Sequence, residues 1–150
     1  MIVAVDPGVN FCGAALFTEA GELCFAWLEE NGPRAIHARV KRAYGATSAI
    51  VEVPQVYARS ASKGDPNDLI DVALVAGGVV ALFDPVRVVR PREWKGDAPK
   101  EVVERCARAA IGFQIDRVEQ HKRAALMHNV WDAIAIGLFA TRGSWRPRAN

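Results

Sequence analysis

The sequence predicts a single α/β domain with a mixed sheet, in which three antiparallel strands come first and two parallel strands follow. A chain of 150 residues with 51% hydrophobic and 24% charged residues is typical of one soluble globular domain. A domain of this length buries about 70% of its unfolded surface, so a proper core is possible. The first thirty residues hold short apolar runs joined by turns, and the later apolar runs are separated by helical patterns, which favours parallel pairing.

Three strands are predicted in the first part of the chain, at residues 2–6, 11–18 and 22–29. Their connections, PGVN and EAGE, are short and contain glycine, as β-hairpin connections do. Neighbouring strands should therefore be antiparallel. Two further strands are predicted, one that ends near Glu52 and one with the sequence VRVV.

The helical patterns cover residues 31–45, 65–83, 98–112 and 124–143. Pro33 suits a first helical position, Gly45 a C-terminal cap and Asp65 an N-cap. The helix at 65–83 is apolar nearly all round, so we expect it to be buried on most sides. In the helix at 98–112, we expect four residues to face inward, namely Val102, Val103, Cys106 and Ala110. This order of strands and helices is that of the ribonuclease H-like fold.

The whole chain, 1–150, is expected to be one domain, with 143–150 as a flexible basic tail. No signal peptide or membrane-spanning segment is expected, because the N-terminus lacks a basic stretch and the central apolar run is too short. Three cysteines without a CxxC pair predict reduced thiols. We therefore expect a cytoplasmic protein with no membrane partner.

Charge is distributed unevenly along the chain, although the net charge is only +2. Residues 1–32 contain five acidic and no basic residues, whereas residues 86–150 contain 13 basic and 7 acidic residues, a local net charge of +6. This asymmetry fits a surface that binds a polyanion. It equally fits a scattered, solvated basic surface.

Three acidic residues stand where an apolar environment would make a charge costly. Asp6 closes the first strand, Glu52 closes the fourth, and Asp132 lies within an apolar helix. Because the fourth strand is predicted to lie parallel beside the first, Asp6 and Glu52 should share one end of the sheet. His128 and Asn129 precede Asp132 by about one helical turn. Such a set of ligands could hold hard divalent ions.

Each acidic residue also has an ordinary structural explanation. Asp6 before Pro-Gly can begin a turn, and Glu52 can be a solvated strand end. Asp132 can pair with Lys122 or Arg123 of the preceding segment. The three acids nevertheless coincide at the positions that one site would need, which favours the site.

The stretches IVAVDPGVNFCGAALF, IVEVPQVY and HNVWDAIAIGL resemble the three catalytic blocks of the RuvC family of Holliday junction resolvases. The match runs in order over nearly the whole chain and is strongest with divergent, phage-type members. The resemblance implies that Asp6, Glu52 and Asp132 are catalytic and hold two Mg²⁺ ions, for which Mn²⁺ would substitute. It also implies a homodimer that nicks two symmetric strands of a four-way DNA junction.

The fourth ligand of the family, an Asp or a His three residues before the last Asp, is Asn129 in this sequence. Asn129 could ligate through its carbonyl. His128 could instead reach the metal from one turn back and also move a proton. His128 could equally be an ordinary hydrogen-bonded core histidine.

The resemblance further implies residues that contact DNA. In the family, an aromatic residue after the fourth strand inserts at the junction centre, and Tyr57 is the matching residue, followed by Arg59 and Lys63. The stretch RPREWKGDAPK resembles the basic segment of the family, which makes Lys95 and Lys100 phosphate-contact candidates. Tyr57 could instead pack on the domain rim, and the basic stretch could be a solvated loop.

We therefore expect a metal-dependent endonuclease that resolves four-way DNA junctions in a bacterial or phage-infected cell. The alternatives are another ribonuclease H-like nuclease, acting on branched DNA or structured RNA, and a non-catalytic nucleic-acid-binding module. An actin-like ATPase also begins with a strand, Asp and Gly, but it needs two such domains around the nucleotide.

Overall fold

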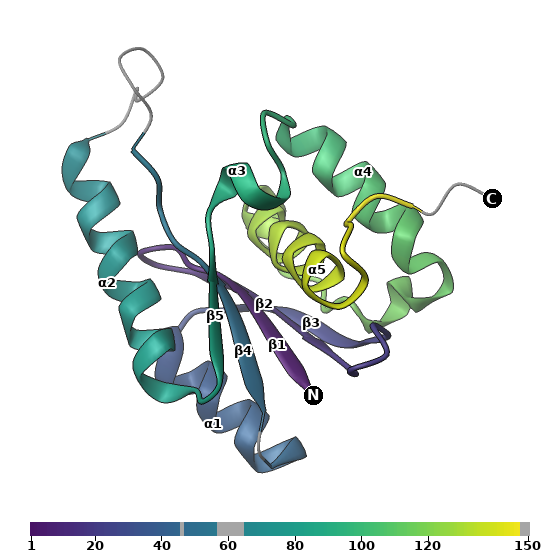
Figure 1. The fold of residues 1–150 in the computed structure, drawn as a ribbon, viewed down its shortest axis with the longest axis horizontal. Coiled ribbons are helices and arrows are strands. Elements are labelled where there is room, and N and C mark those ends of the chain that lie inside the picture. Colours follow the sequence, from purple (N-terminus) through teal and green to yellow (C-terminus); the bar gives the residue numbers. More distant parts are fainter. Residues whose placement is uncertain (46, 57–64, 148–150) are drawn as a thin grey trace.

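A computed structural model describes residues 1–45, 47–56 and 65–147 of the chain. It consists of a mixed five-stranded sheet with helices on both faces (Figure 1). The elements are, in chain order, β1 (Ile2–Asp6), β2 (Cys12–Phe17), β3 (Leu23–Glu29), α1 (Gly32–Tyr44), β4 (Ser48–Glu52), α2 (Pro66–Leu82), β5 (Val86–Val89), α3 (Pro91–Trp94), α4 (Lys100–Ile111), η1 (Gly112–Arg117), η2 (Ala124–Leu126) and α5 (Met127–Arg142).

The sheet confirms the predicted topology, with strand order β3-β2-β1-β4-β5. β1, β2 and β3 form an antiparallel meander, and β4 and β5 extend it in parallel from β1. The carboxyl ends of β1, β4 and β5 therefore meet at one end of the sheet. The fold is the α/β, ribonuclease H-like fold that the sequence predicts.

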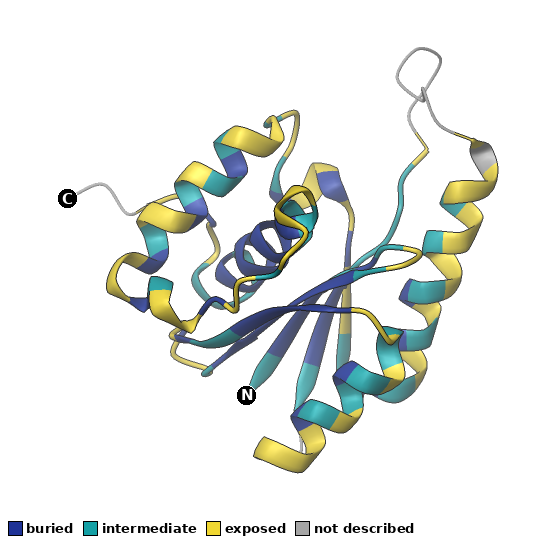
Figure 2. Cartoon of the chain, turned by 180° about the vertical axis from the view of Figure 1, so that it is seen from behind, coloured by how far each residue is buried: buried dark blue, intermediate teal, exposed yellow. Residues whose placement is uncertain are grey.

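Two hydrophobic clusters lie on the two faces of the sheet. On one face, α5 lies across β1 and β2 with α4 outside it, and nearly all of α5 from Val130 to Leu138 is buried (Figures 1 and 2). The segment Ala124–Arg142 is long and apolar enough to span a membrane by composition alone, with a mean hydropathy of 1.2, but its central place in this core accounts for that composition. On the other face, α1 and α2 cover the second cluster.

The prediction that the helix at 65–83 is buried on most sides is wrong. α2 buries only Ala76 and Val79 among its described side chains, whereas Ile70 is 59% and Leu74 is 70% exposed (Figure 2). One face of α2 packs against β4 and α1. Asp65 is its N-cap as predicted, since the carboxylate accepts a hydrogen bond from the backbone N–H of Asn67.

The segment predicted as a flexible tail is also different, because Trp145 within it is only 3% exposed. Gly143 adopts a left-handed conformation (φ 74°) after α5 and turns the chain back toward α3, where the indole of Trp145 is buried. Residues 148–150 lie outside the described part of the chain. In α4, Val103, Ala107 and Ile111 form the buried stripe, while the other three residues predicted to face inward are partly buried.

The two edges of the sheet differ. At the β3 edge, Ala26 forms a bridge with Val118, and the N–H of Glu119 donates to the Ala26 carbonyl. The β5 edge is only four residues long, and Arg87 and Val88 in its middle are exposed. All three cysteines are free, as predicted.

Candidate active site

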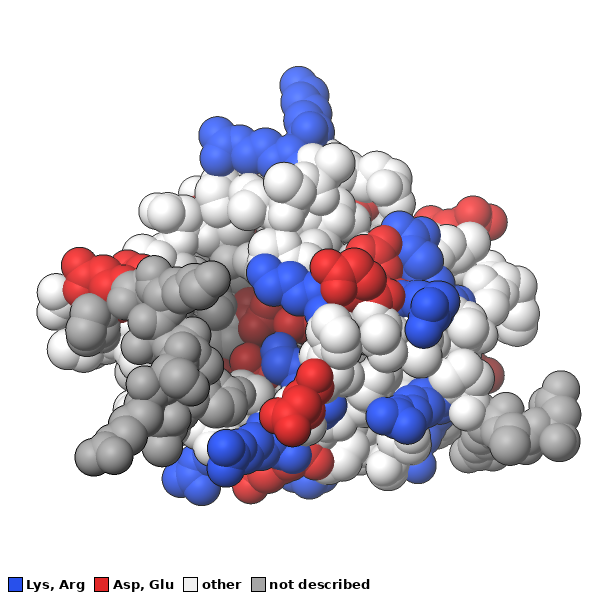
Figure 3. Space-filling model, turned by 90° about the horizontal axis from the view of Figure 1, so that it is seen from above, with Lys and Arg blue, Asp and Glu red and all other residues white. Residues whose placement is uncertain are grey.

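The structure brings Asp6, Glu52 and Asp132 together at the carboxyl end of the sheet. Asp6 and Glu52 are the last residues of β1 and β4, and Asp132 on α5 is 6% exposed. Figure 3 looks onto this end of the molecule, where acidic side chains lie recessed in a hollow with Lys and Arg side chains beside it. Within the described part of the chain, no contact joins His128 to this cluster. Three of the DNA-contact candidates, Tyr57, Arg59 and Lys63, lie outside the described residues.

A glycine on β2 allows α5 to reach the cluster. Gly13 pairs with Asp6 in the β1–β2 register, and a Cβ atom at this position would lie 1.9 Å from the backbone carbonyl oxygen of Asn129. Only glycine permits so close an approach between a strand and a helix. The contact fixes the first turn of α5 beside Asp6, and Asp132 follows one turn later.

The ammonium group of Lys95 lies between two of the carboxylates. Its Nζ is 3.0 Å from Asp132 Oδ2 and 3.7 Å from Glu52 Oε2. Burial lowers the pKa of Lys95, but the negative charges of Asp132 and Glu52 more than offset this effect, so the pKa is raised above its ordinary value. Lys95 is therefore a protonated counter-ion within the cluster and does not extend from it as an isolated surface contact.

Trp94 is the contributor that the sequence did not predict. Its indole N–H donates to Glu52 Oε2 at 2.5 Å, and its ring lies 4.7 Å from the Lys95 ammonium, within range of a cation–π contact. Its only sequence signal is a tryptophan inside a basic segment directly before Lys95. The short helix α3 positions both side chains, since it begins at Pro91 where β5 ends.

Asp6 has the least compensated charge of the three acids. No hydrogen bond or ion pair reaches its carboxylate from the described residues. Burial raises the pKa of Asp6 well above its usual value, the charges of Asp132 and Glu52 raise it further, and Lys95 and Lys100 act in the opposite direction. Burial also raises the pKa of Glu52, against the effects of Lys95 and the Trp94 indole.

The raised pKa of Asp6 predicts a pH-dependent stability in metal-free buffer. A carboxyl group that binds its proton more tightly when folded destabilises the fold once it is deprotonated. The penalty is complete above the folded pKa and disappears below the ordinary value of 3.8. We therefore expect Asp6→Asn to melt several °C above the wild type at pH 8, since 1 kcal/mol corresponds to about 2–4 °C in a domain of this size.

This difference in melting temperature should shrink as the pH is lowered from 8, and thermal unfolding in EDTA measures it. A difference in melting temperature that does not change with pH would contradict the raised pKa of Asp6. The comparison with Asp6→Asn cancels the contributions of acidic residues that lie away from the cluster.

The two candidates for a fourth ligand, His128 and Asn129, each contact a backbone carbonyl group. His128 Nδ1 is 2.8 Å from the carbonyl oxygen of Ala125, and among the described residues the imidazole contacts none of the three carboxylates. The Asn129 amide donates to the carbonyl oxygen of Phe11 at 3.2 Å and so ties α5 to the β1–β2 turn. The ligand roles of His128 and Asn129 stay predictions.

The donor atoms of the cluster suit divalent cations. In this structure, however, the ammonium group of Lys95 occupies the space between two of the carboxylates. Three carboxylates are the oxygen ligands that Mg²⁺ and Mn²⁺ prefer. Within the described ranges, no three His, Cys, Asp or Glu side chains converge closely enough to ligate one ion directly. The ammonium group of Lys95 supplies the positive charge between Glu52 and Asp132, and the described residues place no hydrogen-bond or ion-pair partner on Asp6.

No protein-family model matches the chain, and no curated protein matches it in sequence. Solved structures do match in fold. RuvC of T. thermophilus in complex with a Holliday junction substrate aligns with a TM-score of 0.63 and 21% identity over 98% of both chains. Another Thermus thermophilus RuvC structure aligns with a TM-score of 0.55 and 22% identity over 98% of this chain and 99% of that one.

A fowlpox virus resolvase in complex with its substrate Holliday junction DNA also matches, with a TM-score of 0.54 and 17% identity over 95% of this chain and 99% of that one. At these identities the likeness establishes the fold. The chain thus has the ribonuclease H-like fold of RuvC and the poxvirus resolvase, with three carboxylates gathered at the carboxyl end of β1 and β4.

Proposed function

We propose that this protein is a divalent-metal-dependent endonuclease that resolves four-way DNA junctions. The observation that carries the proposal is the convergence of Asp6, Glu52 and Asp132 at one end of the sheet, with Asp6 lacking a partner among the described residues. Buried carboxylates that repel one another destabilise a fold, so such a cluster is typical of a functional site. The fold likeness to resolvases bound to Holliday junctions supports the choice of substrate.

In this proposal Asp6, Glu52 and Asp132 would hold two Mg²⁺ ions, or Mn²⁺ in their place. Bound ions of this kind lower the pKa of an attacking water and stabilise the charge on the departing oxygen. The chain contributes the recessed position of the carboxylates and, through Trp94, the orientation of Glu52. The ammonium group of Lys95 pairs with Asp132 and Glu52 in this structure. Once bound cations neutralise these carboxylates, the ammonium group would be released to contact a phosphate oxygen of the DNA.

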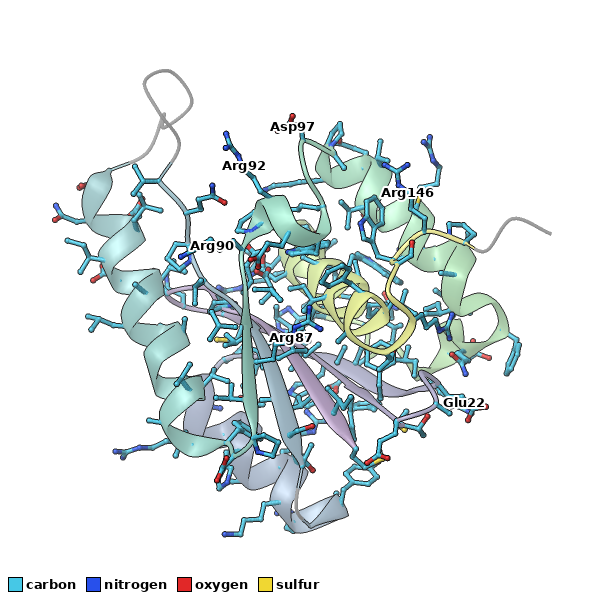
Figure 4. The ribbon with its side chains drawn as sticks, viewed as in Figure 1. Glu22, Arg87, Arg90, Arg92, Asp97 and Arg146 are labelled. Atoms are coloured by element: carbon cyan, nitrogen blue, oxygen red, sulfur yellow. The ribbon has the colours of Figure 1, made fainter. Side chains whose placement is uncertain are left out.

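Basic residues lie beside the opening of the site and would contact the DNA backbone. Arg90 and Arg92 lie where β5 passes into α3 (Figure 4), and Lys100 opens α4, near enough to lower the pKa of Asp6. Such contacts position the nucleic acid without reading its sequence. Selectivity for a junction would then come from the shape and deformability of the DNA.

The proposal is tested with a four-way junction, a linear duplex and a structured RNA, each incubated with Mg²⁺ and the wild type or Asp6→Asn. We expect the wild type alone to nick the junction symmetrically. If the protein binds the junction but cleaves it in neither Mg²⁺ nor Mn²⁺, the proposed nuclease activity is excluded. Cleavage of the RNA alone would indicate a ribonuclease. Glu29→Gln is the matched control, because Glu29 is a buried acid on β3 outside the cluster.

Paired nicking requires two active sites on one junction, and we propose that a homodimer supplies them. The exposed apolar surface of α2 continues into the segment after β4, where a recess of about 390 Å³ is lined by Pro54, Val56, Leu69, Ile70, Ala73 and Leu74. Pro54 follows Glu52 by two residues, so this surface adjoins the site. A second copy that packs through the same surface would form a two-fold symmetric dimer with one site in each subunit.

Leu74→Glu is expected to convert the dimer to a monomer, because it places a charge on the apolar surface of α2. Sedimentation velocity of the wild type and the variant measures the change. Phe113→Glu is the matched control, since Phe113 is 86% exposed on η1, away from α2. A wild type that sediments as a monomer at micromolar concentration would contradict the proposed dimer.

A further inference from the structure

Two tryptophans connect the end of the described chain to one of the three carboxylates. The indole N–H of Trp145 donates to the backbone carbonyl oxygen of Trp94, and the two rings lie nearly perpendicular with centroids 6.3 Å apart. The indole N–H of Trp94 in turn donates to Glu52 Oε2 at 2.5 Å. Trp145 and Trp94 are 3% and 5% exposed, so water does not replace these contacts easily.

The contact between Trp145 and Trp94 has a clear physical reason. Trp94 is the last residue of α3, a helix of four residues, and the carbonyls at the end of a helix have no partner within it. A buried carbonyl without a donor is unfavourable, so the Trp145 indole satisfies a group that the fold would otherwise leave unpaired. The turn at Gly143 is what returns the chain to this position.

The connection reaches two groups of the cluster at once. Trp94 holds Glu52 directly, and Lys95, the next residue in the chain, forms the ion pairs with Glu52 and Asp132. Any shift of the end of α3 therefore moves both a carboxylate and its counter-ion. Trp145, which lies outside α3, holds the end of this helix through its hydrogen bond to the Trp94 carbonyl.

We propose that Trp145 is a positioning residue for Glu52, acting through Trp94, and that the segment 143–147 belongs to the scaffold of the active site. The proposal rests on the proposed function only in treating Glu52 as a metal-binding group. The contacts themselves do not depend on that role.

The first measurement is the rate at which the Trp94 indole proton exchanges with solvent, observed by NMR and assigned by its loss in Trp94→Phe. Trp145→Phe keeps an aromatic ring but removes the N–H donor, and we expect it to raise this rate about fivefold to tenfold, as loss of one hydrogen bond of ordinary strength would. Trp145→Leu replaces it if the phenylalanine variant does not fold, since leucine also lacks a donor.

Trp27→Phe is the matched control for this exchange measurement. The Trp27 indole also donates to a carboxylate, Glu29 Oε2 at 3.2 Å, but that carboxylate lies outside the cluster. We expect this variant to leave the exchange of the Trp94 indole proton unchanged. An unchanged rate in a folded Trp145 variant would overturn the proposal.

The second measurement is a double-mutant cycle on Mg²⁺ binding, followed by the backbone amide signals of Asp6 and Glu52. We expect Trp94→Phe to raise the Mg²⁺ midpoint about tenfold, as loss of a residue that orients a ligand commonly does. Trp145→Phe should raise it about threefold, and the double variant no more than Trp94→Phe alone, because both act along one path. Effects that multiply would overturn the proposal.

The two proposals fail in different ways. A wild type whose amide signals do not respond to Mg²⁺ would contradict the metal-dependent function, and the indole exchange rates would then decide the role of Trp145 alone. If the wild type binds Mg²⁺ and Trp145→Phe binds it with the same midpoint, only the positioning role is contradicted.

Discussion

Replacing Gly13 by alanine is expected to lower the free energy of unfolding by about 3 kcal/mol and to abolish cleavage by the protein that remains folded. The added Cβ would lie 1.9 Å from the carbonyl oxygen of Asn129 and 2.2 Å from its carbonyl carbon. Both are backbone atoms of α5, so the helix itself must move away from the sheet. Asp132 lies one turn further along that helix and would move away from Asp6.

Thermal unfolding and junction cleavage measure the two effects, and the melting temperature should fall by about 6–12 °C for a domain of this size. Gly137→Ala is the matched control, since a Cβ there would lie 2.0 Å from the buried ring of Phe17, further along α5. We expect that variant to be destabilised as well, but to keep the activity of its folded fraction. Gly13→Ala with unchanged activity would show that α5 does not need this contact to place Asp132.

Replacing Lys95 by methionine is expected to destabilise the metal-free protein by about 3 kcal/mol. The change leaves Glu52 and Asp132 without their shared counter-ion, and breaking a buried ion pair on one side costs about 3–5 kcal/mol. The lower value applies because the Lys95 side chain is 21% exposed. Mg²⁺ should raise the melting temperature of this variant more than that of the wild type, since no ammonium competes with the cation.

The same variant should cleave a junction at least about a hundredfold more slowly, the effect of removing one charge-stabilising group from an active site. Lys41→Met, at the end of α1, changes the net charge equally and should alter neither property. Melting curves with EDTA and with Mg²⁺ give the first result, and single-turnover cleavage gives the second. A metal-free Lys95→Met protein as stable as the wild type would contradict the role of Lys95 as a counter-ion.

The sheet could be predicted from the sequence because its strands end at clear turn residues and because Asp65 marks the start of the helix between β4 and β5. The surroundings of α2 could not be predicted. A helix that is apolar nearly all round has no polar face to indicate which side meets solvent, so composition alone does not distinguish burial within the domain from an exposed apolar surface. The burial of Trp145 could not be predicted either, because the basic residues around it indicate a solvated segment.

The three carboxylates could be predicted because each one interrupts an apolar stretch. Asp6 and Glu52 end neighbouring parallel strands, which fixes their common location once the topology is known. The contacts of Trp94 and Lys95 were not accessible in the same way. They depend on the direction in which the chain leaves β5, and a single turn of helix at Pro91 sets that direction. The sequence marked Lys95 as a cation near a phosphate, but not as the partner of Asp132.

The unequal edges of the sheet have a consequence for solubility at high concentration. An open strand edge can pair with the edge of another molecule and begin aggregation. The β3 edge is covered by the chain at Val118 and Glu119, and β5 offers only four residues, with the charged side chain of Arg87 among them. A short and charged edge is a poor template for a further strand, so the sheet should resist growth into larger β-assemblies even where the apolar surface of α2 brings molecules together.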